Sequence, residues 1–298
     1  PFNIALDEIT KTHSYEKLEL QPLKKDSVET LISDTMQPYA SDIVALTEII
    51  YRKTNGNPFF INELLKSLYK NKLLSFNHNT EQWSWDLEKI KNTKISDNVV
   101  EFILEKLQTL PSDCVSALKF ASCIGNRFDL KTISAIMKKE THEVSTILWD
   151  AVREEVIFTK GNNYRIANID GDDKLNIVYE FQHDRIQQAS HSLIKDTEKQ
   201  ETHLKIGRYC LENYSDSEKD EHIIEIVNHI NTGDALIDNP IEREQLIDLN
   251  LSAGKKAQSS FAYAVAARFV SKGISLLPEK TWQSKYKTTF DLYKGFAQ

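Results

Sequence analysis

Hydrophobic and polar positions in the first third of the chain follow a helical period on both sides of a sharp corner. Apolar residues recur three and four positions apart in residues 28–32 and again in residues 43–50, as on the buried face of a helix. Gly56 then suits the left-handed end of one helix, Asn57 the N-cap of the next, and Pro58 its first position. We therefore expect two helices joined by a tight corner. The second helix is expected to bury Ile61, Leu64, Leu65 and Leu68.

The sequence patterns that predict secondary structure before and after this corner are weaker. A short helix is expected only around Ile4 to Ile9, and Leu18 to Leu23 is expected to be extended because Pro22 biases the residue before it away from helix. Residues 77–96 are polar, apart from Trp83 and Trp85, whose alternation predicts a short strand.

The middle third mixes helical and strand patterns. Four successive runs have helical spacing, at residues 97–107, 111–125, 133–137 and 144–152. Strand patterns follow at Val156 to Thr159 with Tyr164 to Ile166, and at Leu175 to Phe181, with the turn-rich residues 168–173 between them. Helices followed by a hairpin are the order of a winged helix, which we expect here.

From about Lys199 the chain shows helical spacing without strand signals, and the last helix is expected to begin near Trp282. Small residues in this part allow close approach of helix backbones, namely Ala253, Gly254, Ala257, Ala264 and Ala267. Paired helices with such positions predict a tetratricopeptide-like stack, which normally offers a groove for a protein partner. The alternative is a packing domain without a partner.

These patterns predict a mainly α protein with a helical lid, a winged-helix domain carrying a small β-hairpin, and tetratricopeptide-like antiparallel helix pairs. The expected parts are residues 1–18 as the end of an upstream core or linker, 19–93 as the lid, 94–195 as the winged-helix domain, and 196–298 as the start of a helical repeat. Because the chain starts at Pro1 and stops inside a helical pattern, we expect it to be a piece of a larger protein.

Composition sets the class of protein. The 298 residues are 40% hydrophobic and 27% charged, as in an ordinary ordered soluble chain. The three cysteines are widely separated and contain no CxxC pair, which fits a reducing cytosol and a cytoplasmic location. The sequence contains no apolar run of about 20 residues and no signal peptide, so we expect no membrane partner.

Charge argues against DNA as a partner. The formal net charge is −7, whereas DNA affinity depends largely on cations that neutralise phosphates. The helix that would enter the major groove, residues 141–155, carries Arg153 as its one strong base. Its acids are Glu143, Asp150, Glu154 and Glu155, and the expected wing tip adds Asp170, Asp172 and Asp173. We therefore expect a structural or sensing domain that does not bind DNA.

The junction after Phe181 is the strongest candidate site. A strand pattern ends there and a helical pattern begins, with Asp184 and Gln187 spaced as a capping box and Asp184 expected as the N-cap. Three interpretations of His183 compete: a structural junction, a phosphoacceptor histidine, and a nucleotide-sensing histidine. The second is disfavoured because the histidine-kinase H-box lies within a helix and carries a proline where this chain has Gln188.

No catalytic motif is found. The glycines do not have the spacing of a phosphate loop, and neither HExxH nor Gly-x-Ser-x-Gly occurs. His222 and His229 would lie about 10 Å apart on a helix, too far for one metal. His191 and His203 are expected to be isolated surface or core histidines, and we expect the chain to bind no metal.

Several motifs together resemble the STAND (AAA-related) signal-transduction ATPases, and especially the ATPase module fused to serine/threonine kinase and sensor histidine kinase domains in very large bacterial signalling proteins. The motifs are Gly56 to Phe60, the winged-helix pattern, Phe181 to Ala189, Ile226 to His229 and Leu249 to Ala257. The resemblance covers the chain from about Leu20 to Phe296.

This resemblance implies roles for three residues. Pro58 would pack near the nucleotide base, His183 would reach the β-phosphate of ADP and hold a closed inactive state, and Arg185 would be a second phosphate contact. A charge-assisted bond from His183 would contribute about 1.5–3 kcal/mol. The phosphate loop would lie upstream of Pro1, in a nucleotide-binding domain that is the expected partner. ATP and ADP are thus expected cofactors of the parent protein only.

The function expected from the sequence is therefore a regulatory, nucleotide-state-sensing fragment of a STAND-type ATPase in a multidomain signalling kinase. The chain alone is not expected to be an enzyme, while the parent is expected to be an ATPase fused to a protein kinase or histidine kinase. Two alternatives remain: part of an ATP-dependent transcription activator of the same superfamily, and a non-enzymatic helical protein-interaction adaptor.

Overall fold

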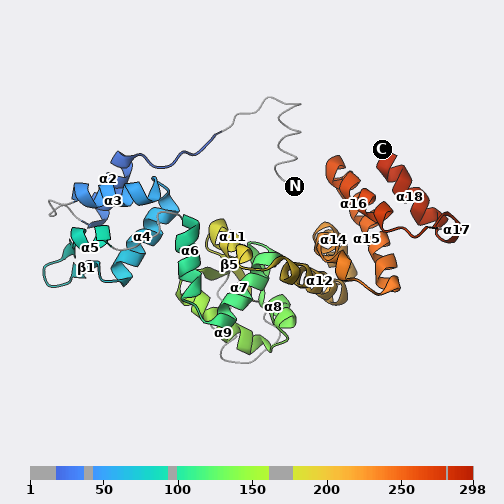
Figure 1. The fold of residues 1–298 in the computed structure, drawn as a ribbon, viewed down its shortest axis with the longest axis horizontal. Coiled ribbons are helices and arrows are strands. Elements are labelled where there is room, and N and C mark those ends of the chain that lie inside the picture. The colour runs from blue at the N-terminus through green and yellow to red at the C-terminus, as the bar shows by residue number, and fades with distance from the viewer. Residues whose placement is uncertain (1–17, 37–42, 93–98, 161–176, 280, 298) are drawn as a thin grey trace. The chain divides into compact units, whose positions relative to one another are not determined.

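The computed structural model describes residues 18–36, 43–92, 99–160, 177–279 and 281–297. Within them the chain is mainly helical, with two small antiparallel sheets (Figure 1). It divides into an N-terminal unit, Glu16–Thr109, and a C-terminal unit, Leu110–Gln298. The finer division into lid, winged helix and helical repeat stays a prediction.

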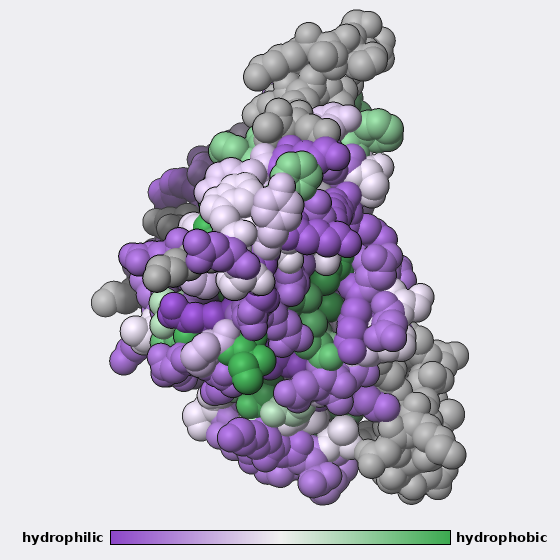
Figure 2. Space-filling model, turned by 90° about the vertical axis from the view of Figure 1, so that its right-hand side faces the viewer, coloured by the Kyte–Doolittle hydropathy of each residue, from purple (hydrophilic) through white to green (hydrophobic). Residues whose placement is uncertain are grey.

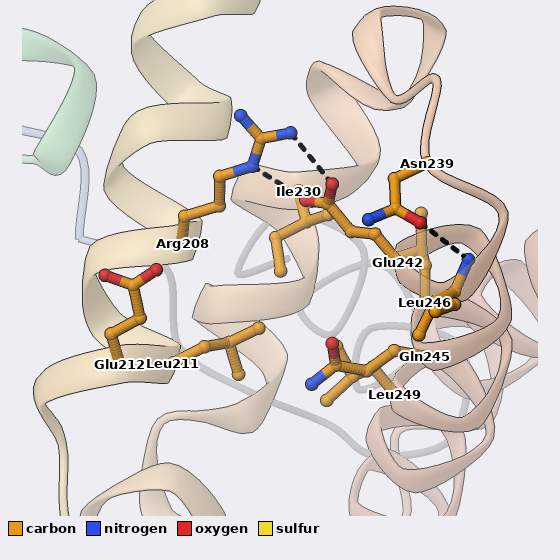
Figure 3. Close-up of a pocket in the computed structure, with 10 residues that line it drawn as sticks. Arg208, Leu211, Glu212, Ile230, Asn239, Glu242, Gln245, Leu246 and Leu249 are labelled. Carbon is orange, nitrogen blue, oxygen red and sulfur yellow. Dashed lines mark hydrogen bonds and ion pairs between the residues drawn. The ribbon is translucent and has the colours of Figure 1, made fainter.

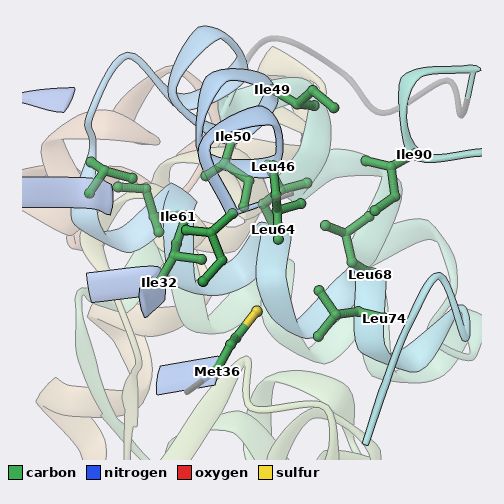
Figure 4. Packing of buried hydrophobic residues seen from close by; sticks show 12 residues of the cluster. Ile32, Met36, Leu46, Ile49, Ile50, Ile61, Leu64, Leu68, Leu74 and Ile90 are labelled. Atoms are coloured by element: carbon green, nitrogen blue, oxygen red, sulfur yellow. The ribbon is translucent and has the colours of Figure 1, made fainter. Parts of the chain in front are cut away.

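The N-terminal unit is built from helices and one hairpin. The helices and strands are α2 (Lys25–Met36), α3 (Ile43–Thr54), α4 (Pro58–Lys70), β1 (Leu74–Asn77), β2 (Gln82–Trp85), α5 (Leu87–Asn92) and α6 (Val99–Gln108). Strands β1 and β2 pair antiparallel, which confirms the short strand predicted from the two tryptophans. Figure 4 shows the aliphatic core that α2, α3, α4 and α5 share, which includes Ile32, Leu46, Ile50, Leu64 and Ile90.

The predicted corner between α3 and α4 is confirmed. Gly56 has φ +73°, in the left-handed region, and its carbonyl accepts a 2.8 Å hydrogen bond from the backbone N–H of Leu23. A Cβ at Gly56 would lie 2.1 Å from the Leu23 carbonyl oxygen, so this close approach requires glycine. The Asn57 side chain accepts a 3.1 Å bond from the Phe60 N–H, and Pro58 follows in the first turn of α4.

Helix α6 packs on α4 through one aromatic and one ionic contact. The rings of Phe60 and Phe102 lie 5.5 Å apart between centroids. Lys106 donates a 2.6 Å hydrogen bond to Glu63, whose side chain is only 5% exposed. This contact explains the second phenylalanine of the corner motif as a core residue.

The first half of the C-terminal unit combines helices with a three-stranded sheet. The helices and strands are α7 (Ser112–Ile124), β3 (Arg127–Asp129), α8 (Leu130–Met137), α9 (Thr141–Arg153), β4 (Ile157–Lys160), β5 (Val178–Phe181) and α11 (Asp184–Ser192). The sheet order is β3-β5-β4 and both pairings are antiparallel. The sequence did not predict β3, because three residues are too short to show an alternation.

The second half is a stack of helices. The described elements are α12 (Asp196–Asn213), α13 (Asp216–Glu221), α14 (Ile223–Thr232), η1 (Asp234–Leu236), α15 (Pro240–Ser259), α16 (Tyr263–Ser275), α17 (Thr281–Ser284) and α18 (Tyr286–Ala297). Helix α14 packs on α12 and α15, and α16 packs on α15 and α18. The predicted single last helix is wrong, because α17 and α18 are separate, with the break at Lys285.

The predicted buried face of α16 is also shifted. Ala264 and Ala267 are exposed, whereas Ala266, Phe269, Val270 and Gly273 face the core. Ala253, Gly254 and Ala257 on α15 are buried as predicted. A Cβ at Gly254 would lie 2.8 Å from the Val270 side chain, so α15 and α16 do approach closely at this point.

Some predictions fall on residues that the structure does not describe. They are the helix around Ile4 to Ile9, the strand at Tyr164 to Ile166, the position of Leu175, and the acidic wing tip at Asp170, Asp172 and Asp173. Among the described residues, no helix combines the length and the apolar character that crossing a bilayer requires.

Candidate functional site

His183 lies at the junction between β5 and α11, as its sequence pattern predicted. Tyr179 and Phe181 are buried on β5, and Phe181 contacts Phe128 of β3 with ring centroids 5.5 Å apart. This packing fixes the end of the strand. The His183 side chain is half-buried, and the next two residues, Asp184 and Arg185, are exposed.

The N-cap of α11 is His183 and not Asp184, so that prediction is wrong. The Nδ1 atom of His183 accepts a 3.1 Å hydrogen bond from the Arg185 backbone N–H. Asp184 is the first helical residue, where its charge can interact with the helix dipole. The predicted partner of a capping box, Gln187, instead donates a 3.2 Å bond to the Ser122 carbonyl on α7. An imidazole is an uncommon cap, which is why residue preference favoured the aspartate.

The cap determines which His183 nitrogen can act on a ligand. Because Nδ1 accepts from the backbone, the neutral ring carries its proton on Nε2, which is then a donor. The exposed Arg185 bonds to Gln188 by Nη1 at 3.2 Å on the following turn of α11. Both side chains therefore fit contacts to a phosphate at a helix N-terminus.

Pro58, the third predicted site residue, is exposed at the first turn of α4. It belongs to the N-terminal unit, whereas His183 and Arg185 belong to the C-terminal unit. The structure thus brings two of the three predicted residues, His183 and Arg185, together at the start of α11.

A second cluster was missed by sequence reasoning. His203 on α12 and His229 on α14 lie with their Nδ1 atoms 2.8 Å apart. The ligand atoms of Cys123 on α7, His191 on α11 and His203 all lie within 4.8 Å of one another. No spacing rule identifies this group, because its members come from four helices. His191 and His203 are not isolated, contrary to the sequence prediction.

Burial controls the protonation of this cluster. It lowers the pKa of His229 to about 4, with a further lowering from the charge of His203. Burial also lowers the pKa of His203 and of His191, and the nearby Lys199 lowers both further. The Cys123 thiol has its pKa raised to about 11 by burial. The imidazoles are therefore neutral and the thiol protonated near pH 7.

The helical stack carries a groove between α12 and α15 with a volume of about 340 Å³. As Figure 3 shows, Arg208 reaches Glu242 across it, with two bonds of 2.7 and 2.9 Å. Leu246 and Leu249 are apolar parts of its lining, and Ile241 is 75% exposed beside them. The face of the molecule that Figure 2 shows is mostly hydrophilic, with hydrophobic patches between the hydrophilic residues.

Comparison with known proteins gives two relatives. No protein-family model matches the chain. Hybrid signal transduction histidine kinase G of Dictyostelium discoideum is 30% identical over 330 residues, which cover 95% of this chain and 10% of that protein. Peroxide stress-activated histidine kinase mak3 of Schizosaccharomyces pombe is 22% identical over 236 residues, which cover 77% of this chain and 9% of the relative. The chain thus spans about a tenth of the length of the curated relatives it matches, and both are histidine kinases by name.

Proposed function

We propose that the chain is the regulatory, nucleotide-state-sensing segment of a STAND-type ATPase in a large signalling histidine kinase. The single observation that carries this proposal is the geometry of His183, which caps α11 through Nδ1 and so places the N–H of its neutral ring on Nε2. The similarity of 95% and 77% of the chain to segments of two proteins that are named histidine kinases supports the signalling context. The motifs from Gly56 to Ala189 support the ATPase type.

In this proposal the nucleotide binds to a separate nucleotide-binding domain of the parent protein, which supplies the phosphate loop. His183 and Arg185 then contact the phosphates of ADP from the second side, and Pro58 packs near the base. ATP and ADP are the cofactors, and they bind only when both sides are present. The contacts from His183 and Arg185 exist in the closed state alone, so they favour that state in proportion to their strength.

The cap changes the expected strength of the His183 contact. A charged imidazole would carry hydrogens on both nitrogens and could no longer accept from the Arg185 N–H. With Nδ1 used by the cap, the ring offers a phosphate one N–H, on Nε2, and a net hydrogen bond of this kind contributes about 0.5–1.5 kcal/mol. This is less than the charge-assisted bond expected from the sequence, and the Arg185 guanidinium then provides the charge for the phosphate.

The test separates capping from sensing in the intact parent kinase. Asparagine is a good N-cap, so His183→Asn keeps the hydrogen bond to the Arg185 N–H and removes the imidazole. We expect His183→Asn to weaken ADP binding about 2- to 12-fold, the factor that corresponds to 0.5–1.5 kcal/mol, with a much smaller change for ATP. Basal kinase output should rise, because only the closed state loses a contact. Calorimetry with each nucleotide and an autophosphorylation assay measure both effects.

Asp184→Ala is the matched control, because it changes the neighbouring charge and leaves the cap in place. It should cost about 0.3–1 kcal/mol of helix stability without nucleotide selectivity. If His183→Asn and Asp184→Ala alter ADP and ATP affinities equally, His183 is a structural junction and the sensing proposal fails.

A protein-binding role for the helical stack is a second candidate, favoured by the groove beside the exposed Ile241. A partner helix with an apolar side chain would cover Ile241 and Leu249 while polar groups meet Arg208 and Glu242. Ile241→Arg should then weaken binding of the purified nucleotide-binding domain to this chain at least tenfold, whereas the exposed Asn213→Ala should not. Equal binding by both variants would remove the groove from the interface.

A further inference from the structure

Four side chains from four helices of the C-terminal unit meet at one place. Cys123 lies near the end of α7, His191 near the end of α11, His203 within α12 and His229 within α14. The ligand atoms of the first three all lie within 4.8 Å of one another. A thiol and two imidazoles in such a cluster are a donor set that suits zinc among the divalent metals.

The fourth residue, His229, determines how His203 can act. The Nδ1 atoms of the two rings are 2.8 Å apart, so one ring donates and the other accepts. If His203 donates, its Nε2 carries a lone pair and is available to a cation. Metal-bound histidines commonly donate their second N–H to a fixed acceptor, which orients the ring. The buried His229 provides such an acceptor.

We propose that Cys123, His191 and His203 bind one Zn²⁺ ion, with His229 as the positioning residue that orients His203. Zinc lies about 2.0–2.1 Å from imidazole nitrogen and about 2.3 Å from thiolate sulfur. These bonds separate ligand atoms by about 3.3–3.6 Å in a tetrahedral site, so no pair of atoms that now lies within 4.8 Å needs to approach by more than about 1.5 Å on binding. The Cys123 thiol releases its proton to solvent as the sulfur–zinc bond forms. A water molecule completes the fourth position.

Lys199 is the feature that opposes a cation here. Its charge acts on Cys123, His191 and His203 together. Its ammonium group lies 3.4 Å from the Asp196 carboxylate, at the exposed start of α12. The Asp196 carboxylate partly neutralises the lysine charge. The Glu198 carboxylate acts on Cys123 with a sign opposite to that of Lys199. Removing the lysine charge should therefore strengthen zinc binding, a change that a purely packing role for the cluster does not predict.

The consequence of binding is mechanical. Zinc would join α7 and α11, which pack beside the three-stranded sheet, to α12, the first long helix of the stack. Metal bound only by the folded state adds to its stability by mass action. The zinc site shares no residue with the nucleotide proposal, and zinc binding needs no nucleotide. The zinc proposal and the His183 proposal can therefore succeed or fail separately.

The experiment titrates Zn²⁺ into the full chain after chelator treatment, with thermal unfolding and calorimetry as readouts. We expect one ion per chain and a higher melting temperature. Cys123→Ser, His191→Gln and His203→Gln should each lose at least tenfold in zinc affinity, and His229→Leu about 10- to 100-fold, as for a second-shell partner. Lys199→Gln should bind zinc more tightly than the unmodified chain.

Matched controls use residues of the same type outside the cluster. Cys210→Ser changes another buried cysteine and His222→Gln an exposed histidine, and both should bind zinc like the unmodified chain. Co²⁺ adds a direct readout, since the sulfur-to-metal absorption should vanish in Cys123→Ser and persist in Cys210→Ser. If Cys123→Ser does not fold, the half-exposed His191→Gln decides with the same titration. Zinc affinity that is equal in the cluster variants and the controls would overturn the proposal.

Discussion

The side-chain amides of Asn231 on α14 and Asn250 on α15 form two reciprocal hydrogen bonds, of 2.8 and 3.0 Å. Asn250 is completely buried, and it also donates a 2.9 Å bond to the Leu246 carbonyl of its own helix. A buried polar group is costly unless it is bonded. This pair therefore fixes the register of α14 against α15, where a purely aliphatic contact would permit sliding.

Removing one member of the pair should destabilise the chain strongly. Asn231→Ala leaves the buried Asn250 amide without its cross-helix partner, and an unsatisfied buried group costs about 1–3 kcal/mol. Urea unfolding of the purified chain measures the change. Asn213→Ala, at the exposed end of α12, is the control and should change the free energy of unfolding by less than about 0.5 kcal/mol. Equal changes in the free energy of unfolding for Asn231→Ala and Asn213→Ala would mean that the asparagine pair does not stabilise the packing of α14 on α15.

The backbone at Gly56 gives a second prediction. Alanine there would place Cβ 2.1 Å from the Leu23 carbonyl oxygen at a φ of +73°. We expect Gly56→Ala to cost more than about 1 kcal/mol, because both the clash and the left-handed φ oppose it. Gly295→Ala is the control: its Cβ would meet Val270 at 3.6 Å, an ordinary contact, within α18. It should be neutral or stabilise by about 0.5–1 kcal/mol. Thermal unfolding of both variants tests the contrast.

These two regions show what the sequence could predict. The corner at Gly56 to Pro58 was correctly predicted, because its residue types follow local backbone requirements. Helical spacing located the longer helices for the same reason, but it missed the six-residue α5 (Leu87–Asn92), because residues 77–96 were expected to be looped. By contrast, the Asn231–Asn250 pair joins two helices, so neither residue's own segment indicates it.

The wrong predictions also concern features that depend on contacts between different helices and strands. The register of α16 was misjudged because its alanines fit either face, and only the position of Phe269 against α15 selects one. The N-cap of α11 was assigned to Asp184 by residue preference, while the strand geometry at Phe181 places His183 there. Of the candidate site, the sequence indicated the His183 junction but not the cysteine–histidine cluster, which exists only after four helices pack.

The ion pair between Glu63 and Lys106 gives a third prediction. Lys106→Met leaves a carboxylate that is 5% exposed without its 2.6 Å partner, although Lys66 remains 3.7 Å away. We expect a loss of about 3 kcal/mol. The double variant with Glu63→Met should recover most of that loss, because no charge is then left buried.

Lys91→Met, which removes an exposed pair with Glu88, should change the free energy of unfolding by less than about 1 kcal/mol. Chemical unfolding distinguishes these outcomes, and a double variant as unstable as Lys106→Met contradicts the charge argument.

The last prediction concerns alkaline pH and the thiol of Cys114, which is completely buried on α7. Burial raises its pKa from 9.0 to about 12, so the folded state keeps the thiol protonated after the unfolded state has ionised. The unfolded state then binds fewer protons, and the stability that the thiol contributes below pH 9 decreases as the pH rises towards 12.

The difference in unfolding free energy between the unmodified chain and Cys114→Ala should therefore fall by about 1.4 kcal/mol per pH unit above pH 9. Ser116→Ala, on the same helix and without a titrating group, should differ from the unmodified chain by the same amount at every pH. Urea unfolding from pH 8 to 10.5 measures both differences, and parallel curves for Cys114→Ala would mean that the thiol ionises in the folded chain as readily as in water.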